Sequence, residues 1–140
     1  MAFRFEFDSV NKVLLARFAG RLTEEVFLEF RHEIREHSAA TNPRMGIMDY
    51  SWVTQFAISS SLIRELAKQE PPIGNIPRVI VVQSTAGFGL ARMFQIAGGP
   101  KSSGLKIARS LDEAFAELGV QSPHFELLNR QSNKLIPPQK

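Results

Sequence analysis

The first part of the chain changes from a strand-like to a helix-like hydrophobic pattern. Phenylalanine at every second position alternates with charged residues over residues 3–8, which predicts a strand with one buried face. Polar residues 8–12 predict a turn, and apolar residues 13–18 predict a second strand that ends at Gly20. The two strands are therefore expected to form an antiparallel hairpin.

A helix is predicted over residues 24–38, with Thr23 as its N-cap and two glutamates in its first turn. Its apolar stripe consists of Val26, Phe27, Phe30 and Ile34. The apolar residues 45–50 predict a central third strand, and residues 51–57 are expected to form a loop.

The remaining two thirds of the chain continue the alternation. A serine run opens a second helix, whose buried face is Leu62, Ile63, Leu66 and Ala67 and which Pro71 and Pro72 stop. The later predicted elements are a strand over residues 79–82, a helix over 87–97, a strand over 105–109 and a helix between Ser110 and Gly119. This order predicts a single α/β domain with a mixed, mostly parallel five-stranded sheet opened by the hairpin and about four helices.

The domain is expected to end near residue 120. Residues 121–140 contain three prolines and no hydrophobic period, so they are predicted to form a partly disordered tail. Phe125, Leu127 and Leu128 are the residues in it that could return to the core.

Composition excludes several classes of protein. The chain has 140 residues, 44% of them hydrophobic, and no cysteine, so disulfides and thiolate metal sites are excluded. Its net charge of +3 is spread among acidic residues without a basic run, which argues against nucleic-acid binding. A charged N-terminus and the lack of a long apolar stretch predict a cytoplasmic protein.

No catalytic, metal-binding or cofactor-binding constellation emerges. His32 and His37 are five residues apart, which places them on different helix faces, and they are interpreted as solvated. Gly87 and Gly89 lack the third glycine and the acidic residue of a dinucleotide site, so close packing is the better interpretation. No serine lies in a Gly-x-Ser-x-Gly elbow, and we expect a non-catalytic protein without a cofactor.

Two candidate surfaces follow from the predicted elements. Strand ends should gather polar residues into a candidate ligand crevice made of Asp49, Ser51, Gln83, Ser84 and Thr85, although Asp49 could equally be a loop-capping carboxylate. The helix over residues 87–97 is apolar nearly all round, which predicts a homodimer. Its oligomer surface would comprise Phe88, Leu90, Met93 and Phe94.

The element order and two segments resemble the STAS domain of bacterial anti-sigma-factor antagonists, the SpoIIAA-like group. The first segment runs from Asp49-Tyr50-Ser51-Trp52-Val53 to Ile58-Ser59-Ser60-Ser61-Leu62 and resembles that family's strand end and serine pair. The second, Phe88-Gly89-Leu90-Ala91-Arg92-Met93, is similar to a segment of its STAS/SEC14-like branch.

This resemblance implies a regulatory interaction module whose partner is a regulatory protein or a kinase. Ser59 and Ser60 would then be the phosphorylation site or partner surface; alternatively, one of them is simply the N-cap of the second helix. The SEC14-like relatives suggest a different function, the binding of a small apolar ligand or lipid or contact with a membrane surface.

Overall fold

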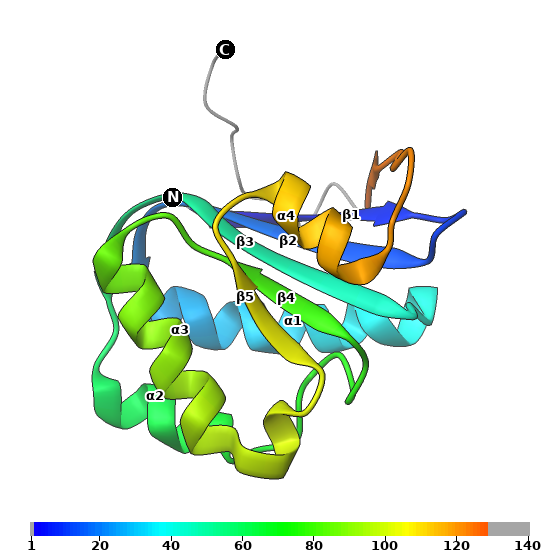
Figure 1. Cartoon of the computed structure of the whole chain (residues 1–140). Helices are drawn as coiled ribbons and strands as arrows, with labels where there is room; N and C mark the ends of the chain where they lie inside the picture. The colour runs from blue at the N-terminus through cyan, green and yellow to red at the C-terminus, as the bar shows by residue number, and fades with distance from the viewer. Residues whose placement is uncertain (1, 129–140) are drawn as a thin grey trace.

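Strands and helices alternate along most of the chain (Figure 1). The computed structural model describes residues 2–128. The strands are β1 (Ala2–Asp8), β2 (Val13–Thr23), β3 (Met45–Ala57), β4 (Arg78–Val81), β5 (Leu105–Ala108) and β6 (Glu126–Leu127). The helices are α1 (Glu24–Thr41), α2 (Ser60–Ala67), α3 (Thr85–Gly98) and α4 (Leu111–Leu118), and a 3₁₀ turn η1 (Gly99–Ser102) follows α3.

All of these strands belong to one sheet in the order β5-β4-β3-β2-β1-β6. β1 pairs antiparallel with β2 and with β6, whereas β2, β3, β4 and β5 are parallel neighbours. The prediction of one α/β domain with a mostly parallel sheet opened by a hairpin is therefore confirmed, and β6 is the additional strand.

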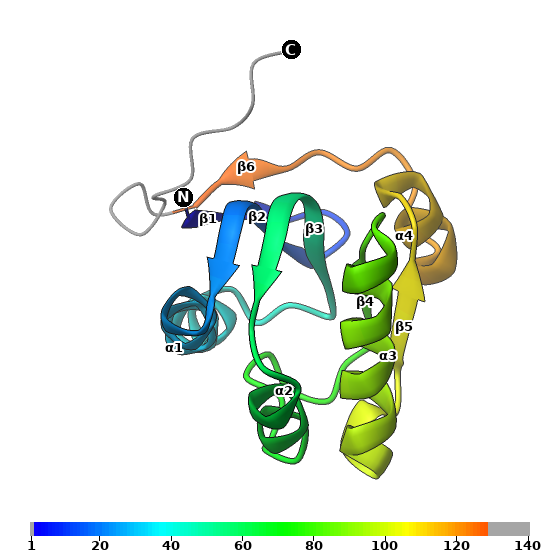
Figure 2. The ribbon, with the colours of Figure 1, turned by 90° about the vertical axis from the view of Figure 1, so that its left-hand side faces the viewer.

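Helices cover the two faces of the sheet unequally. α1, α2 and α3 lie on one face and α4 on the other (Figures 1 and 2). Each right-handed crossover from β2 to β5 moves one strand in the same direction, so the three connecting helices fall on the same side. The larger core lies between these helices and the sheet, and a smaller core lies beneath α4.

Two predicted strand ends are wrong. β2 continues through Gly20, whose φ of +80° accompanies an irregular register with β3, and it ends only at Thr23. β3 likewise continues through residues 51–57, which were predicted as a loop, by pairing Ala19 with Trp52 and Thr23 with Ala57. β4 pairs only as far as Asp49, so this extension is flanked on one side and its polar residues stay near solvent.

Residues 121–128, predicted as part of the tail, contribute to the sheet. Glu126 and Leu127 pair with β1, and the Leu128 N–H donates to the Phe5 carbonyl at 2.9 Å. The Phe125 ring stacks on Phe115 of α4, with centroids 6.1 Å apart. The remaining residues of the predicted tail, 129–140, lie outside the described residues.

A chain ending at Val120 is expected to melt more than about 5 °C below one ending at Leu128, which corresponds to roughly 1 kcal/mol. The shorter chain loses the Phe115–Phe125 contact and re-exposes the edge of β1. Melting temperatures measured by circular dichroism test this difference. If the two chains melt within about 2 °C of one another, the returning segment does not contribute to the core.

Candidate functional site

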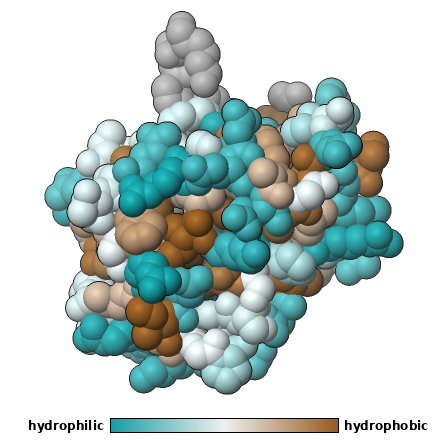
Figure 3. All heavy atoms as spheres, in the orientation of Figure 1, coloured by the Kyte–Doolittle hydropathy of each residue, from teal (hydrophilic) through white to brown (hydrophobic). Residues whose placement is uncertain are grey.

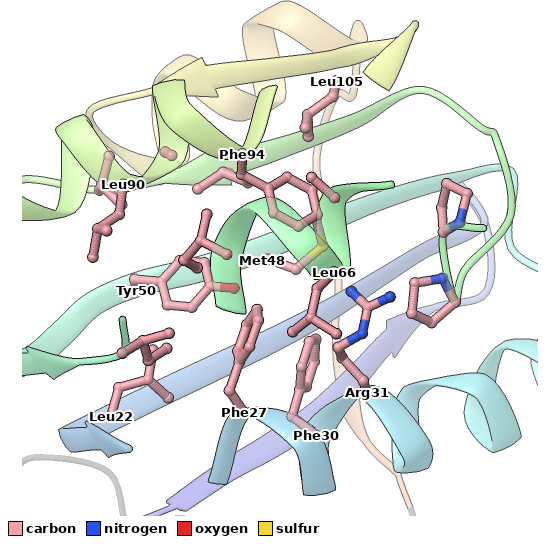
Figure 4. A pocket seen from close by; sticks show the side chains of 18 of the residues that line it. Leu22, Phe27, Phe30, Arg31, Met48, Tyr50, Leu66, Leu90, Phe94 and Leu105 are labelled. Carbon is pink, nitrogen blue, oxygen red and sulfur yellow. The ribbon is translucent and has the colours of Figure 1, made fainter. Parts of the chain in front are cut away.

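A cavity opens between the sheet and the helices α1, α2 and α3 (Figure 4). The centre of a water-sized sphere can reach about 90 Å³ of this cavity, and the larger empty space of about 860 Å³ also counts gaps between atoms and the solvent at its mouth. Its described lining is mainly apolar and contains no acidic residue. Side chains that face it include Leu22, Phe27, Phe30, Met48, Leu66, Leu90, Phe94 and Leu105.

The spacing of these residues along the strand and the helix turns their side chains toward the cavity. On β3, Met48 and Tyr50 face the cavity, and Asp49 between them faces the opposite side because strand residues alternate. On α1, Phe27, Phe30, Arg31 and Ile34 follow one another at the spacing of a single helix face. The floor of the cavity is thus the sheet, and its walls are helix faces.

The absence of a side chain at Gly87 sets how closely α3 approaches the sheet. A Cβ at this position would lie 2.9 Å from the Phe56 ring of β3. The interpretation of Gly87 as a close-packing residue is therefore confirmed, whereas a Cβ at Gly89 would meet nothing within 4 Å. The Ser84 hydroxyl accepts the Gly87 N–H at 3.0 Å and caps the same end of α3.

Four polar side chains interrupt the apolar lining: Arg31, Tyr50, Gln69 and Arg78. Burial raises the pKa of the Tyr50 phenol, an effect that the nearby Arg31 charge partly opposes, so the hydroxyl stays neutral. Burial likewise lowers the pKa of both arginines. Arg78 donates to the carbonyls of Ile76 and Lys101 at 3.0 and 2.7 Å.

Within the described part of the chain, Arg31 has no comparable partners. The residue is 7% exposed, and its Nη2 atom is buried without a hydrogen-bond partner among residues 2–128. Sequence analysis did not single out Arg31. The available signal was its position, since it lies four residues after Phe27 and three before Ile34, inside the apolar stripe of α1.

The residues of the predicted crevice have separate partners. Buried Asp49 accepts hydrogen bonds from Arg17 Nε at 3.2 Å and from the Ser51 N–H at 2.9 Å. Ser84 caps α3, and the Gln83 carbonyl accepts from Arg109 at 3.4 Å. Gln83 and Thr85 are exposed. Among the described residues, no side-chain hydrogen bond joins the Asp49–Ser51 pair to residues 83–85.

The predicted oligomer surface on α3 is largely turned inward. Leu90 and Phe94 line the cavity, and Met93 packs against the same core. Phe88 is partly buried beneath the Arg109 guanidinium, which lies 4.3 Å from its ring centroid. Apolar side chains on the face drawn in Figure 3 are interrupted by polar ones. The homodimer remains a prediction, and the cavity and core give most of these residues another role.

The interpretation of both helix histidines as solvated is correct for one of them. His32 is exposed, but His37 is buried, with its ring centroid 4.4 Å from that of Phe5. Five residues of helix turn one histidine outward and the other onto the hairpin. Burial lowers the pKa of His37, although the adjacent Glu36 charge raises it in part.

Ser59 is the N-cap of α2, and its hydroxyl accepts the Leu62 N–H at 3.1 Å. The Ser59 N–H donates to the Glu24 carboxylate at 2.9 Å. Hydrogen bonds from the Ser59 backbone and side chain lower the pKa of Glu24, which therefore places a negative charge beside Ser59. Like-charge repulsion would oppose a phosphate on that serine. Ser60 is exposed in the first turn.

Ser59→Ala is expected to lower the free energy of unfolding by about 1 kcal/mol, because it removes the cap of α2. Ser60→Ala should change it by less than about 0.5 kcal/mol. Urea denaturation measures both effects. A regulatory site predicts an effect on partner binding instead of stability. In that case Ser60→Asp would change the proteins recovered in a pull-down, and neither alanine variant would alter stability.

Neither a metal site nor a membrane span is evident in the described part of the chain. Within residues 2–128, no three histidine, aspartate or glutamate side chains are placed to hold a metal ion. None of the helices there combines the length and apolarity needed to cross a bilayer. Comparison with models of known protein families finds no match, and comparison with curated proteins finds none either.

Proposed function

We propose that this protein binds a small apolar molecule in the cavity between the sheet and the helices α1, α2 and α3. The observation that carries the proposal is the cavity itself, with its mainly apolar lining and open mouth. Ligand sites in proteins are typically concave, mainly apolar and furnished with a few polar groups, and this cavity has those features. It is the function that the SEC14-like resemblance also suggested.

The regulatory-module hypothesis was motivated by the element order and by the lack of a catalytic constellation in the sequence, and its phosphorylation site by the serine pair of the STAS resemblance. The capping role of Ser59 and the adjacent Glu24 carboxylate do not favour a phosphate there. Ligand binding is therefore the better-supported function, and partner binding remains the subject of the Ser60 test.

Blocking the cavity should weaken binding of an uncharged apolar probe. Leu90 faces the cavity from α3, so Leu90→Trp is expected to weaken binding of N-phenyl-1-naphthylamine by at least about tenfold. Ile96 lies on the same helix, is 69% exposed and does not line the cavity, and Ile96→Trp is the matched control. Fluorescence titration measures both affinities.

A wild-type chain that does not bind the probe, or equal binding by the wild type and Leu90→Trp, would contradict the proposal. Native mass spectrometry of the purified protein supplies a second measurement, because a retained small molecule would appear as added mass. That mass should be lost in Leu90→Trp and kept in Ile96→Trp.

A further inference from the structure

The cavity contains a buried cation that the described chain does not neutralise. Arg31 projects from α1 into the cavity, as Figure 4 shows, and the residue is 7% exposed. Its Nη2 atom is buried and has no hydrogen-bond partner among residues 2–128. Leaving a buried charge without a partner is strongly unfavourable, so such a group is rarely a neutral feature of a fold.

Arg78, the other arginine of the same cavity, has the hydrogen bonds expected of a structural arginine. Its Nη1 and Nη2 atoms donate to Ile76 and Lys101 carbonyls at 3.0 and 2.7 Å, and Nη1 also reaches Asn75 Oδ1 at 3.3 Å. These bonds hold the start of β4 against the segment that contains η1. Arg78 is therefore satisfied by the chain, and Arg31 is the arginine of the cavity with a donor left over.

The counter-charge for Arg31 must come from outside the described lining. Within the described lining there is no aspartate or glutamate, and the other charged side chain there, Arg78, is also a cation. Tyr50 faces the same space with its hydroxyl directed inward in Figure 4, and as a neutral phenol it can donate a hydrogen bond. One unsatisfied cation and one neutral donor suit a group with a single negative charge.

On this basis, and resting on the proposed function, we infer that the ligand is an amphipathic monocarboxylate whose carboxylate binds Arg31 and whose apolar body fills the cavity. The guanidinium fork matches the geometry of a carboxylate. The apolar side chains from α2, α3 and the sheet surround the rest of the molecule. A fatty acid has this chemistry.

Decanoate and decanol share a chain length and differ at the head group, so together they separate the two parts of the inference. Isothermal titration calorimetry of the wild type is expected to show decanoate binding at least about tenfold more tightly than decanol, as a charge-assisted hydrogen bond predicts. The Arg31→Met variant should lose this preference and still bind decanol. Arg35→Met, an exposed position one turn further along α1, should retain it.

Each outcome distinguishes the inference from the proposed function. If the wild type binds decanoate and decanol equally and Arg31→Met changes neither affinity, the carboxylate inference is wrong and apolar binding stands. If the wild type binds neither compound nor N-phenyl-1-naphthylamine, the proposed function fails as well. Arg31→Lys keeps the charge without the fork, and retention of part of the preference in this variant supports the inference even if Arg31→Met folds poorly.

Discussion

Phe30→Ala is expected to lower the free energy of unfolding by about 3–5 kcal/mol. Phe30 is buried on α1, where its ring lies within 6.0 Å, centroid to centroid, of Phe3, Phe5, Phe18 and Phe27. The closest pair, with Phe18, is edge to face at 4.6 Å. The Phe30 ring therefore joins α1 to the β1–β2 hairpin, and its loss weakens the contact between them.

The effect is large because truncation removes both apolar contacts and the preferred edge-to-face geometry. Leu28→Ala is the matched control: Leu28 lies on the same helix but is 46% exposed, and its truncation should change stability by less than about 0.5 kcal/mol. Both values follow from urea denaturation monitored by circular dichroism. A loss below about 1.5 kcal/mol in Phe30→Ala would show that the aromatic cluster collapses around the gap.

Strong local patterns account for the parts of the fold that the sequence predicted well. Alternating phenylalanines specify β1, the β-branched run specifies β4, and hydroxyl residues specify the N-caps of α1, α2 and α4. These signals are local, because each depends on a few neighbouring residues. They were sufficient for the fold class and for most element positions.

Errors arose where pairing or packing over a long distance decides the structure. The second half of β3 is strand because β2 also extends beside it, and the sequence of residues 51–57 alone does not contain that information. β6 forms because the edge of β1 is available for pairing. Side chains alternate along β3, so Asp49 lies on the other face of the sheet from Met48 and Tyr50. This alternation could have excluded Asp49 from a site on the cavity face.

The cavity itself was beyond sequence reasoning. Apolar positions on α1, α2 and α3 predict that these faces are buried, but they do not predict how much space the helices leave above the sheet. The sequence feature that indicated the cavity was Arg31, because a charged residue within an apolar helix stripe needs either a partner in the fold or a role in binding. The periodicity of α1 predicts which of its residues are buried, and Arg31 is the charged residue at one of those positions.

Replacing the two cavity arginines is expected to change stability in opposite directions. Arg78→Met should lower the free energy of unfolding by about 2–4 kcal/mol, because it leaves the carbonyls of Ile76 and Lys101 without their donors. Arg31→Met should raise it by about 1–3 kcal/mol, because it replaces a buried charge that has an unsatisfied donor with an apolar side chain of similar length.

Binding sites typically contain residues that destabilise the fold, because their function limits how far stability can be optimised at those positions. Urea denaturation of the two variants in the absence of ligand separates this account from a structural one. Equal losses in Arg31→Met and Arg78→Met would mean that Arg31 supports the packing of α1 as Arg78 supports β4. A gain in Arg31→Met together with the loss of its preference for decanoate over decanol would tie the cost in stability to ligand binding.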